Sequence, residues 1–156
     1  MPPGATSKGI VLAETADARF RKLFSIEGGN FQAAGSVSKQ IKMILKQLSI
    51  DNDLIWRAMI VAYEAEMNAV LYASSCEVTL SVSTRCVSLQ FKDRGPGIPD
   101  IGLAMTEGYS TATREMRERG FGAGLGLPNM KKTADRFHIE SVVGEGTTLQ
   151  MELDLP

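Results

Sequence analysis

Residues 76–98 read CEVTLSVSTRCVSLQFKDRGPGI, and over most of this segment apolar and polar side chains alternate with a period of two. The alternation runs over 76–83, is interrupted by a turn, and resumes over 87–92. Such alternation is typical of a strand with one buried face, and two runs joined by a short turn predict an antiparallel hairpin with its other face in water. The segment therefore predicts a sheet built from neighbouring antiparallel strands.

The patterns on either side of the hairpin indicate helices and further strands. In chain order we expect a strand over 19–27, helices over 36–48 and 52–73, the hairpin, a short helix near 100–107, a helix over 128–136, and strands near 137–143 and 147–154. Strict alternation of strands and helices is absent, and strands that are neighbours in sequence favour antiparallel pairing. We therefore expect a two-layer α/β (α+β) sandwich, with a mixed, mostly antiparallel sheet covered on one face by helices.

The composition is that of an ordinary globular domain. Of 156 residues, 44% are hydrophobic and 22% are charged, and the formal net charge is -1. No apolar run approaches the ~20 residues of a membrane span, and the charge balance lacks the basic footprint of a nucleic-acid binder. The two cysteines have no CxxC or histidine-rich neighbours, so a zinc site is unsupported. We expect a cytoplasmic protein, with a flexible segment over 1–18 and one domain over 19–156.

Asp93 stands at the end of the hairpin, where its position needs an explanation. It shares the parity of the apolar residues over 87–91, which point into the expected core. A buried carboxylate without a partner is costly, so Asp93 either ends the strand and turns outward or meets a hydrogen-bond donor inside. Gly95 and Gly97 follow it, and glycine lets a ligand approach the backbone closely.

Glu64 and Asn68 form a second polar feature, on the helix predicted over 52–73. They are four residues apart and therefore share one helix face. A carboxylate can take a proton from a nucleophile, and an amide oxygen can ligate Mg²⁺. The pair is either part of a site or a polar helix edge in water.

Four glycines occur among the seven residues 120–126, directly before the helix expected at Pro128. The free amides of such a loop can wrap an anion, and the helix N-terminus behind them adds positive potential. No Gly-Lys-Ser/Thr follows, so this is not a Walker A loop, and it matches the dinucleotide-binding pattern poorly because no strand precedes it. The loop is either an anion site or a plain flexible connection.

Residues 144–148, Gly-Glu-Gly-Thr-Thr, form the turn between the last two predicted strands. A hairpin turn needs no function. Thr147 nevertheless shares the parity of Leu149, Met151 and Leu153, so its hydroxyl is expected to face inward.

In their order and spacing, these four segments resemble the motifs of the GHKL (Bergerat-fold) ATP-binding family. Residues 64–69 resemble its N box, 93–98 its first glycine box, 120–126 its second and 144–147 its last. The resemblance covers roughly residues 19–154 and implies the Bergerat ATP-binding fold.

Length and the single histidine narrow the resemblance within this family. The gyrase, Hsp90 and MutL relatives are far larger, and a sensor histidine kinase needs a helical segment with a phospho-accepting histidine, whereas His138 lies in a predicted strand. The chain looks most like the small stand-alone anti-sigma factors and stressosome switch kinases. The segments over 98–111 and at Tyr72-Ala73 look most like the switch-kinase branch.

The resemblance implies a role for each matched residue. Asp93 would accept from the adenine amino group with support from Thr147, Asn68 would ligate Mg²⁺, and Glu64 would be the catalytic general base. The implied ATP-binding residues are Asn68, Asp93, Gly95, Gly97, Ile98, Gly120, Gly122, Ala123, Gly124, Leu125, Gly126 and Thr147. A lid over 105–121 would include Ser110, Thr111, Arg114, Arg117 and Arg119.

The resemblance implies ATP and Mg²⁺ as cofactors and a protein as partner. The main hypothesis is a serine/threonine kinase that transfers the γ-phosphate of ATP to a partner, a STAS-domain antagonist, in the manner of an anti-sigma or switch kinase. The alternative is a protein-binding module with little or no kinase activity, in which the bound nucleotide only sets whether a partner such as a sigma factor or an enzyme is held. Small relatives also form homodimers, and neither nucleic acid nor membrane is an expected partner.

Overall fold

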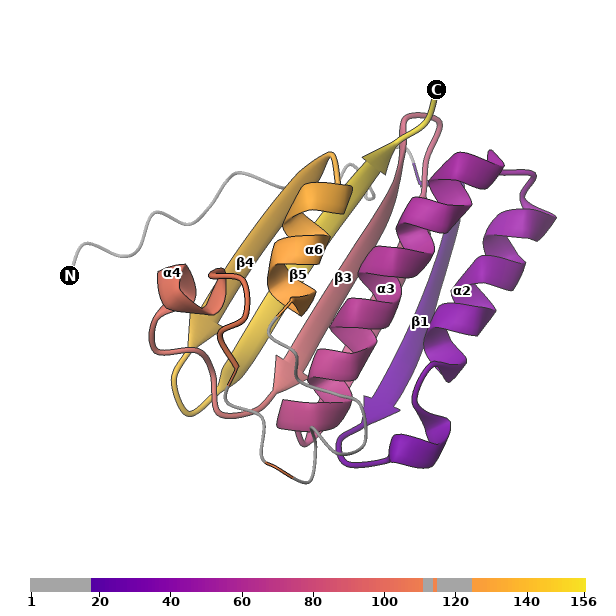
Figure 1. The fold of residues 1–156 in the computed structure, drawn as a ribbon. Coiled ribbons are helices and arrows are strands. Elements are labelled where there is room, and N and C mark those ends of the chain that lie inside the picture. Colours follow the sequence, from indigo (N-terminus) through magenta and orange to yellow (C-terminus); the bar gives the residue numbers. More distant parts are fainter. Residues whose placement is uncertain (1–17, 111–113, 115–124) are drawn as a thin grey trace.

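In the computed structural model, residues 18–110, 114 and 125–156 are described, and they form two layers. Figure 1 shows helices α2, α3 and α6 side by side over one face of a sheet. The elements are β1 (Phe20–Glu27), η2 (Phe31–Ala33), α2 (Ser36–Gln47), α3 (Asn52–Tyr72), β2 (Ser75–Val82), β3 (Cys86–Arg94), α4 (Ile101–Ala104), α6 (Gly126–Thr133), β4 (Arg136–Val142) and β5 (Gly146–Asp154). The predicted flexible segment lies almost entirely outside the described residues.

The sheet has the strand order β1-β2-β3-β5-β4, and each of these pairings is antiparallel. The predicted hairpin is β2 and β3, with Leu80 opposite Leu89. The two-layer sandwich with helices on one face is therefore confirmed. Strand β5 lies between β3 and β4 and pairs antiparallel with β3. The predicted motif that follows β3 and the one that precedes β5 therefore lie next to each other.

Apolar side chains of the sheet's inner face and of α2 and α3 form one core. Val78, Leu80, Leu89 and Met151 are fully buried on the strands. Cys76 and Cys86 are free and buried, and burial raises the pKa of the Cys76 thiol to about 12. This thiol therefore stays protonated and acts as a small apolar group.

Helix α3 is capped by a residue next to it in sequence, whereas helix α2 is capped by a residue far from it in sequence. Asp51 caps α3 as predicted, since its side chain accepts from the Asp53 amide at 3.2 Å. The N-cap of α2 is Gly35, which has no side chain to donate or accept. The buried carboxylate of Glu66 instead accepts from the amides of Val37 and Ser38, at 3.2 and 2.9 Å. Helix α2 is thus capped from α3.

Two predictions about the elements are wrong in detail. The helix predicted to reach Arg136 ends at Thr133, because Ala134 turns to an extended backbone and Arg136 already pairs with Glu152 in the sheet. The outer face of the hairpin is also drier than expected, since Ser81 and Ser88 are both 3% exposed. Small side chains in the middle of a sheet lie below their longer neighbours and lose contact with water. Among the described residues, no helix is long and apolar enough to span a membrane.

Candidate functional site

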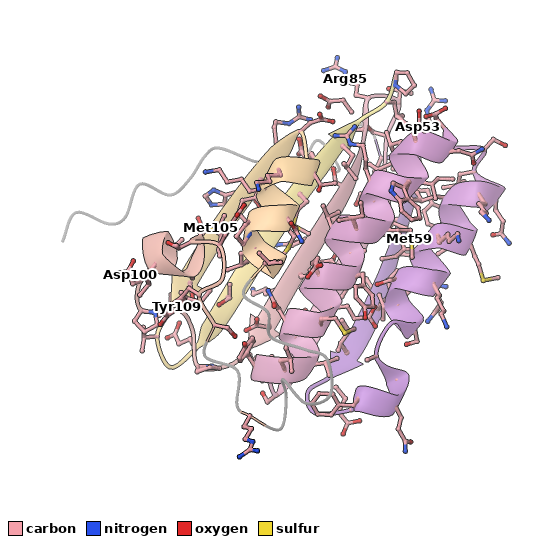
Figure 2. All side chains as sticks on the ribbon, viewed as in Figure 1. Asp53, Met59, Arg85, Asp100, Met105 and Tyr109 are labelled. Atoms are coloured by element: carbon pink, nitrogen blue, oxygen red, sulfur yellow. The ribbon has the colours of Figure 1, made fainter. Side chains whose placement is uncertain are left out.

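A cavity of about 550 Å³ opens between α3, α4, α6 and the ends of β3 and β5. This volume suits a ligand of the size of a cofactor. Figure 2 shows Asp100 and Tyr109 on the α4 side of the molecule, and both line the cavity. The polar residues of its lining are Tyr63, Glu64, Asn68, Tyr72, Asp93, Asp100, Tyr109, Ser110, Asn129 and Thr147.

Asp93 and Thr147 face each other at the sheet end of this cavity. The Thr147 amide donates to Asp93 Oδ1 at 2.9 Å, which is the donor that an inward Asp93 requires. Burial raises the pKa of Asp93, and the hydrogen bond from Thr147 partly offsets that rise. The inward orientation predicted for both residues is confirmed, and Asp93 keeps acceptor capacity for a ligand.

Ser141, on β4, connects this end of the cavity to the loop after β3. Its hydroxyl lies 2.8 Å from Thr147 Oγ1 and accepts from the Ile98 amide at 2.7 Å. Ile98 itself lines the cavity. Sequence reasoning did not single out Ser141, because the bond depends on the pairing of Ser141 with Thr147 across β4 and β5.

The two glycines after Asp93 allow close backbone packing. Gly97 has a φ of +73°, and a Cβ there would lie 2.4 Å from the Val142 carbonyl oxygen. Gly97 lines the cavity, whereas Gly95 packs beside the end of α3, where a Cβ would lie 3.3 Å from the Tyr72 carbonyl oxygen. Glycine at both positions therefore lets the loop lie against β4 and α3.

Glu64 and Asn68 lie at the opposite end of the cavity, beside the start of α6. A Cβ on Gly126 would lie 3.1 Å from Glu64 Oε2 and 3.5 Å from Asn68 Oδ1. Burial raises the pKa of Glu64, and a hydrogen bond with the Asn129 side chain opposes the rise. The predicted pair therefore faces a cavity and not open water.

The start of α6 has the properties of an anion site. Its N-cap, Leu125, offers no side-chain hydrogen bond, so no capping side chain competes with a ligand for the first-turn amides. Leu125 and Gly126 both line the cavity. The other predicted loop residues, Gly120, Gly122, Ala123 and Gly124, lie outside the described part of the chain.

The predicted lid is described only in part. Ser110 lines the cavity, and Arg114 is helical and exposed. Thr111, Arg117 and Arg119 lie outside the described residues.

Sequence reasoning missed most of the apolar lining. Met67 and Leu71, together with the ring of Tyr63, follow at four-residue spacing on α3 and form one wall. Leu103 and Leu149 add to it from α4 and β5. The regular spacing was a usable signal, but the same spacing is also typical of an ordinary core face.

A divalent cation would find few protein ligands here. No group of three or more histidine, cysteine or acidic side chains that could hold a metal occurs in the described segments. Asn68 Oδ1 is an oxygen donor at the α6 end of the cavity. This donor set fits Mg²⁺, which is usually held by one or two protein oxygens together with substrate phosphates and water.

Several known proteins are similar to this chain. The family model described as histidine kinase-, DNA gyrase B-, and HSP90-like ATPase matches residues 56–156. The chain is 35% identical over 91 residues to the serine/threonine-protein kinase RsbT of Bacillus subtilis (strain 168), a match that covers 56% of this chain and 62% of RsbT. It is 31% identical over 107 residues to the anti-sigma F factor of Priestia megaterium, covering 69% of this chain and 67% of that protein.

A solved structure of the RsbU and RsbW domains of a Mycobacterium tuberculosis protein superimposes with a TM-score of 0.55 at 17% identity. The superposition covers 86% of this chain and 32% of the other. At this identity the likeness concerns the fold alone.

Proposed function

Because this chain belongs to the family of histidine kinase-, DNA gyrase B- and HSP90-like ATPases, we propose that its cavity binds ATP and that it phosphorylates a serine or threonine of a partner protein. The proposal depends most on one observation. A single cavity holds a half-buried acceptor, Asp93, at one end, and a carboxylate, Glu64, beside an uncapped helix start at the other.

The Asp93 end suits the base of the nucleotide. One oxygen of Asp93 accepts from the Thr147 amide, which leaves the carboxylate able to accept from the adenine amino group. Thr147, 8% exposed, would support the same edge of the base. An oxo group in place of the amino group would meet a carboxylate with no proton to offer, so this end favours adenine over guanine.

The α6 end suits the phosphates. The amides at Leu125 and Gly126 and the positive end of the α6 dipole favour negative charge. Asn68 would hold Mg²⁺ through its amide oxygen. Bound there, Mg²⁺ would supply neutralisation of phosphate charge.

Glu64, at the α6 end of the cavity, is the residue that we propose as the general base. The partner's hydroxyl oxygen forms a bond to the γ-phosphorus, the bond from that phosphorus to the bridging oxygen breaks, and ADP leaves. The hydroxyl proton passes to Glu64. Its raised pKa makes Glu64 a better base than an exposed carboxylate.

The partner class is proposed by likeness to relatives. RsbT is named a serine/threonine-protein kinase and the other relative an anti-sigma F factor. A STAS-domain protein is the acceptor we propose, with a sigma factor as a second kind of partner. A cytoplasmic location and a homodimer are further expectations from the resemblance.

A second function, a nucleotide-gated binding module, has its own support at the cavity mouth. Leu103, Tyr109 and Leu125 line the cavity and are each more than 40% exposed. Apolar side chains in such a position can bind a partner protein whose grip depends on the nucleotide beneath.

Transfer of label from γ-labelled Mg-ATP to proteins of the host extract tests the main proposal. We expect a labelled band with the wild type and none with Glu64→Gln, and Glu145→Gln, an exposed hairpin-turn variant outside the cavity, serves as the matched control. If the protein binds ATP but no labelled band depends on Glu64, the kinase hypothesis is overturned in favour of the binding module.

A further inference from the structure

Helix α6 runs antiparallel to α3, and side chains of one α3 face contact both of its ends. Glu64 and Asn68 lie beside Gly126 at the start of α6. Arg57, seven residues before Glu64 and on the same face, lies beside Thr133 at the end of α6. Gly126 and Thr133 are also seven residues apart. Segment 57–64 of α3 and segment 126–133 of α6 therefore have the same length, about 10 Å.

Arg57 holds the last turn of α6 through its backbone. Its Nε and Nη2 both donate to the Thr133 carbonyl oxygen, at 3.2 and 2.9 Å. This carbonyl is among the last four of the helix, which have no partner within the helix and form the negative end of its dipole. A guanidinium is the side chain that best satisfies such an acceptor and complements its charge.

The contact is anchored to the sheet through Asp135. Arg57 Nη2 lies 3.0 Å from Asp135 Oδ1. The other Asp135 oxygen accepts from the Asp154 amide at 2.7 Å, and the Asp135 amide donates to the Glu152 carbonyl oxygen at 2.9 Å. Arg57 therefore ties the end of α6 to both α3 and β5.

A short helix depends on such contacts for its position. Helix α6 has eight residues, too few to be stable by itself. Its start has no side-chain cap. The position of α6 along α3 is therefore set by its contacts with other elements: the buried side chain of Met130 in the middle of the helix, and Arg57 at its far end.

We propose that Arg57 is a positioning residue that keeps the first-turn amides of α6 where the nucleotide phosphates bind. The proposal rests on the proposed function for its ligand. Arg57 itself is not part of the cavity lining, so it acts through α6 and not by touching the nucleotide.

The test compares a ligand with phosphates and one without. Calorimetric titration with Mg-ADP and with adenosine is carried out on the wild type, Arg57→Met and Arg57→Lys. We expect Arg57→Met to weaken Mg-ADP binding about tenfold, the loss of hydrogen bonds from a charged group, and to change adenosine binding less than about twofold. Arg57→Lys keeps the charge but not the fork, so its loss is smaller, about threefold.

Arg136→Met is the matched control, because Arg136 also pairs with carboxylates, Glu152 and Asp154, but on β4. It leaves the ratio of the two affinities unchanged. Amide hydrogen exchange in α6 is expected to quicken in Arg57→Met and not in Arg136→Met.

Equal losses for Mg-ADP and adenosine, or no loss for either, would overturn the positioning role. If Arg57→Met does not fold, the same comparison is made with Arg57→Lys and decides in the same way. A wild type that binds no Mg-ADP overturns the proposed function and this role together. If Arg57→Met selectively loses Mg-ADP binding while the wild type shows no kinase activity, the positioning role stands and only the proposed kinase activity is overturned.

Discussion

The carboxylate of Glu64 faces Gly126 so closely that a methyl group on Gly126 would lie 3.1 Å from Glu64 Oε2. Glycine is needed here for space and not for an unusual backbone, since Gly126 is the first residue of a regular helix. The narrow gap is where the proposed base, the amide oxygen of Asn68 and the proposed phosphate site meet.

Gly126→Ala is therefore expected to separate stability from function. Alanine favours a helix over glycine by up to about 1 kcal/mol, and the added Cβ would meet only the outer ends of the Glu64 and Asn68 side chains, so the melting temperature should change little. The methyl group would crowd Glu64 and Asn68 and weaken Mg-ATP binding by roughly tenfold or more, about 1.4 kcal/mol. Thermal unfolding and calorimetry on the same sample check both parts, and normal binding would show that phosphate does not approach this gap.

Asp93→Asn is expected to weaken nucleotide binding strongly without loss of stability. The asparagine oxygen can still accept from the Thr147 amide, and a partly buried charge that burial disfavours is removed. Binding of ATP should fall by about a hundredfold, as for a lost hydrogen bond to a charged group. A melting temperature below that of the wild type would contradict this view of Asp93, as would unchanged binding.

The pH dependence of Glu64 follows from its raised pKa. A folded-state pKa above the unfolded value means that the folded protein binds this proton more tightly, so ionisation of Glu64 costs stability as pH rises from 4.5 through the raised value. Glu64→Gln should thus gain stability relative to the wild type at neutral pH, and the gain should shrink toward pH 4.5. Unfolding by urea across this range measures the difference, and a gain that grows on acidification has the wrong sign.

The rate of phosphoryl transfer should also depend on the ionisation of Glu64. A general base works only when ionised, so kcat should fall as pH drops through the raised pKa of Glu64. The single-turnover rate, measured with saturating Mg-ATP, reports the chemical step. A rate independent of pH between 4.5 and 7 would exclude Glu64 as the base.

Glu66 is expected to be structural although it lies two residues from the proposed base. It is 1% exposed, and its carboxylate accepts from the amides of Gly35, Val37 and Ser38 and from the Ser38 hydroxyl at 2.6 Å. Glu66→Gln places amide hydrogens against these donors and should lower the free energy of unfolding by about 2–4 kcal/mol. Glu77→Gln, at an exposed position of β2, is the control, and equal effects in urea unfolding would contradict the assignment.

Much of the fold could be predicted from local sequence patterns, because neighbouring residues determine which segments form strands and helices. The period of two over 76–92 and the helical spacing over 52–72 depend on neighbouring residues alone, and both elements are confirmed. The end of α6 was predicted three residues too late, since the departure of the chain at Ala134 is set by the pairing of Arg136 with Glu152 in another strand.

Parity and spacing on single elements placed Asp93, Thr147, Glu64 and Asn68 on faces that all turn out to line one cavity. These placements needed only the alternation of a strand and the pitch of a helix. The contacts of Glu66 with α2, of Ser141 with Ile98, and of Arg57 with Thr133 join residues 28, 43 and 76 positions apart. No local pattern carries them, because they exist only where the sheet order brings β4 beside β5 and the packing of the helices brings α3 against α2 and α6.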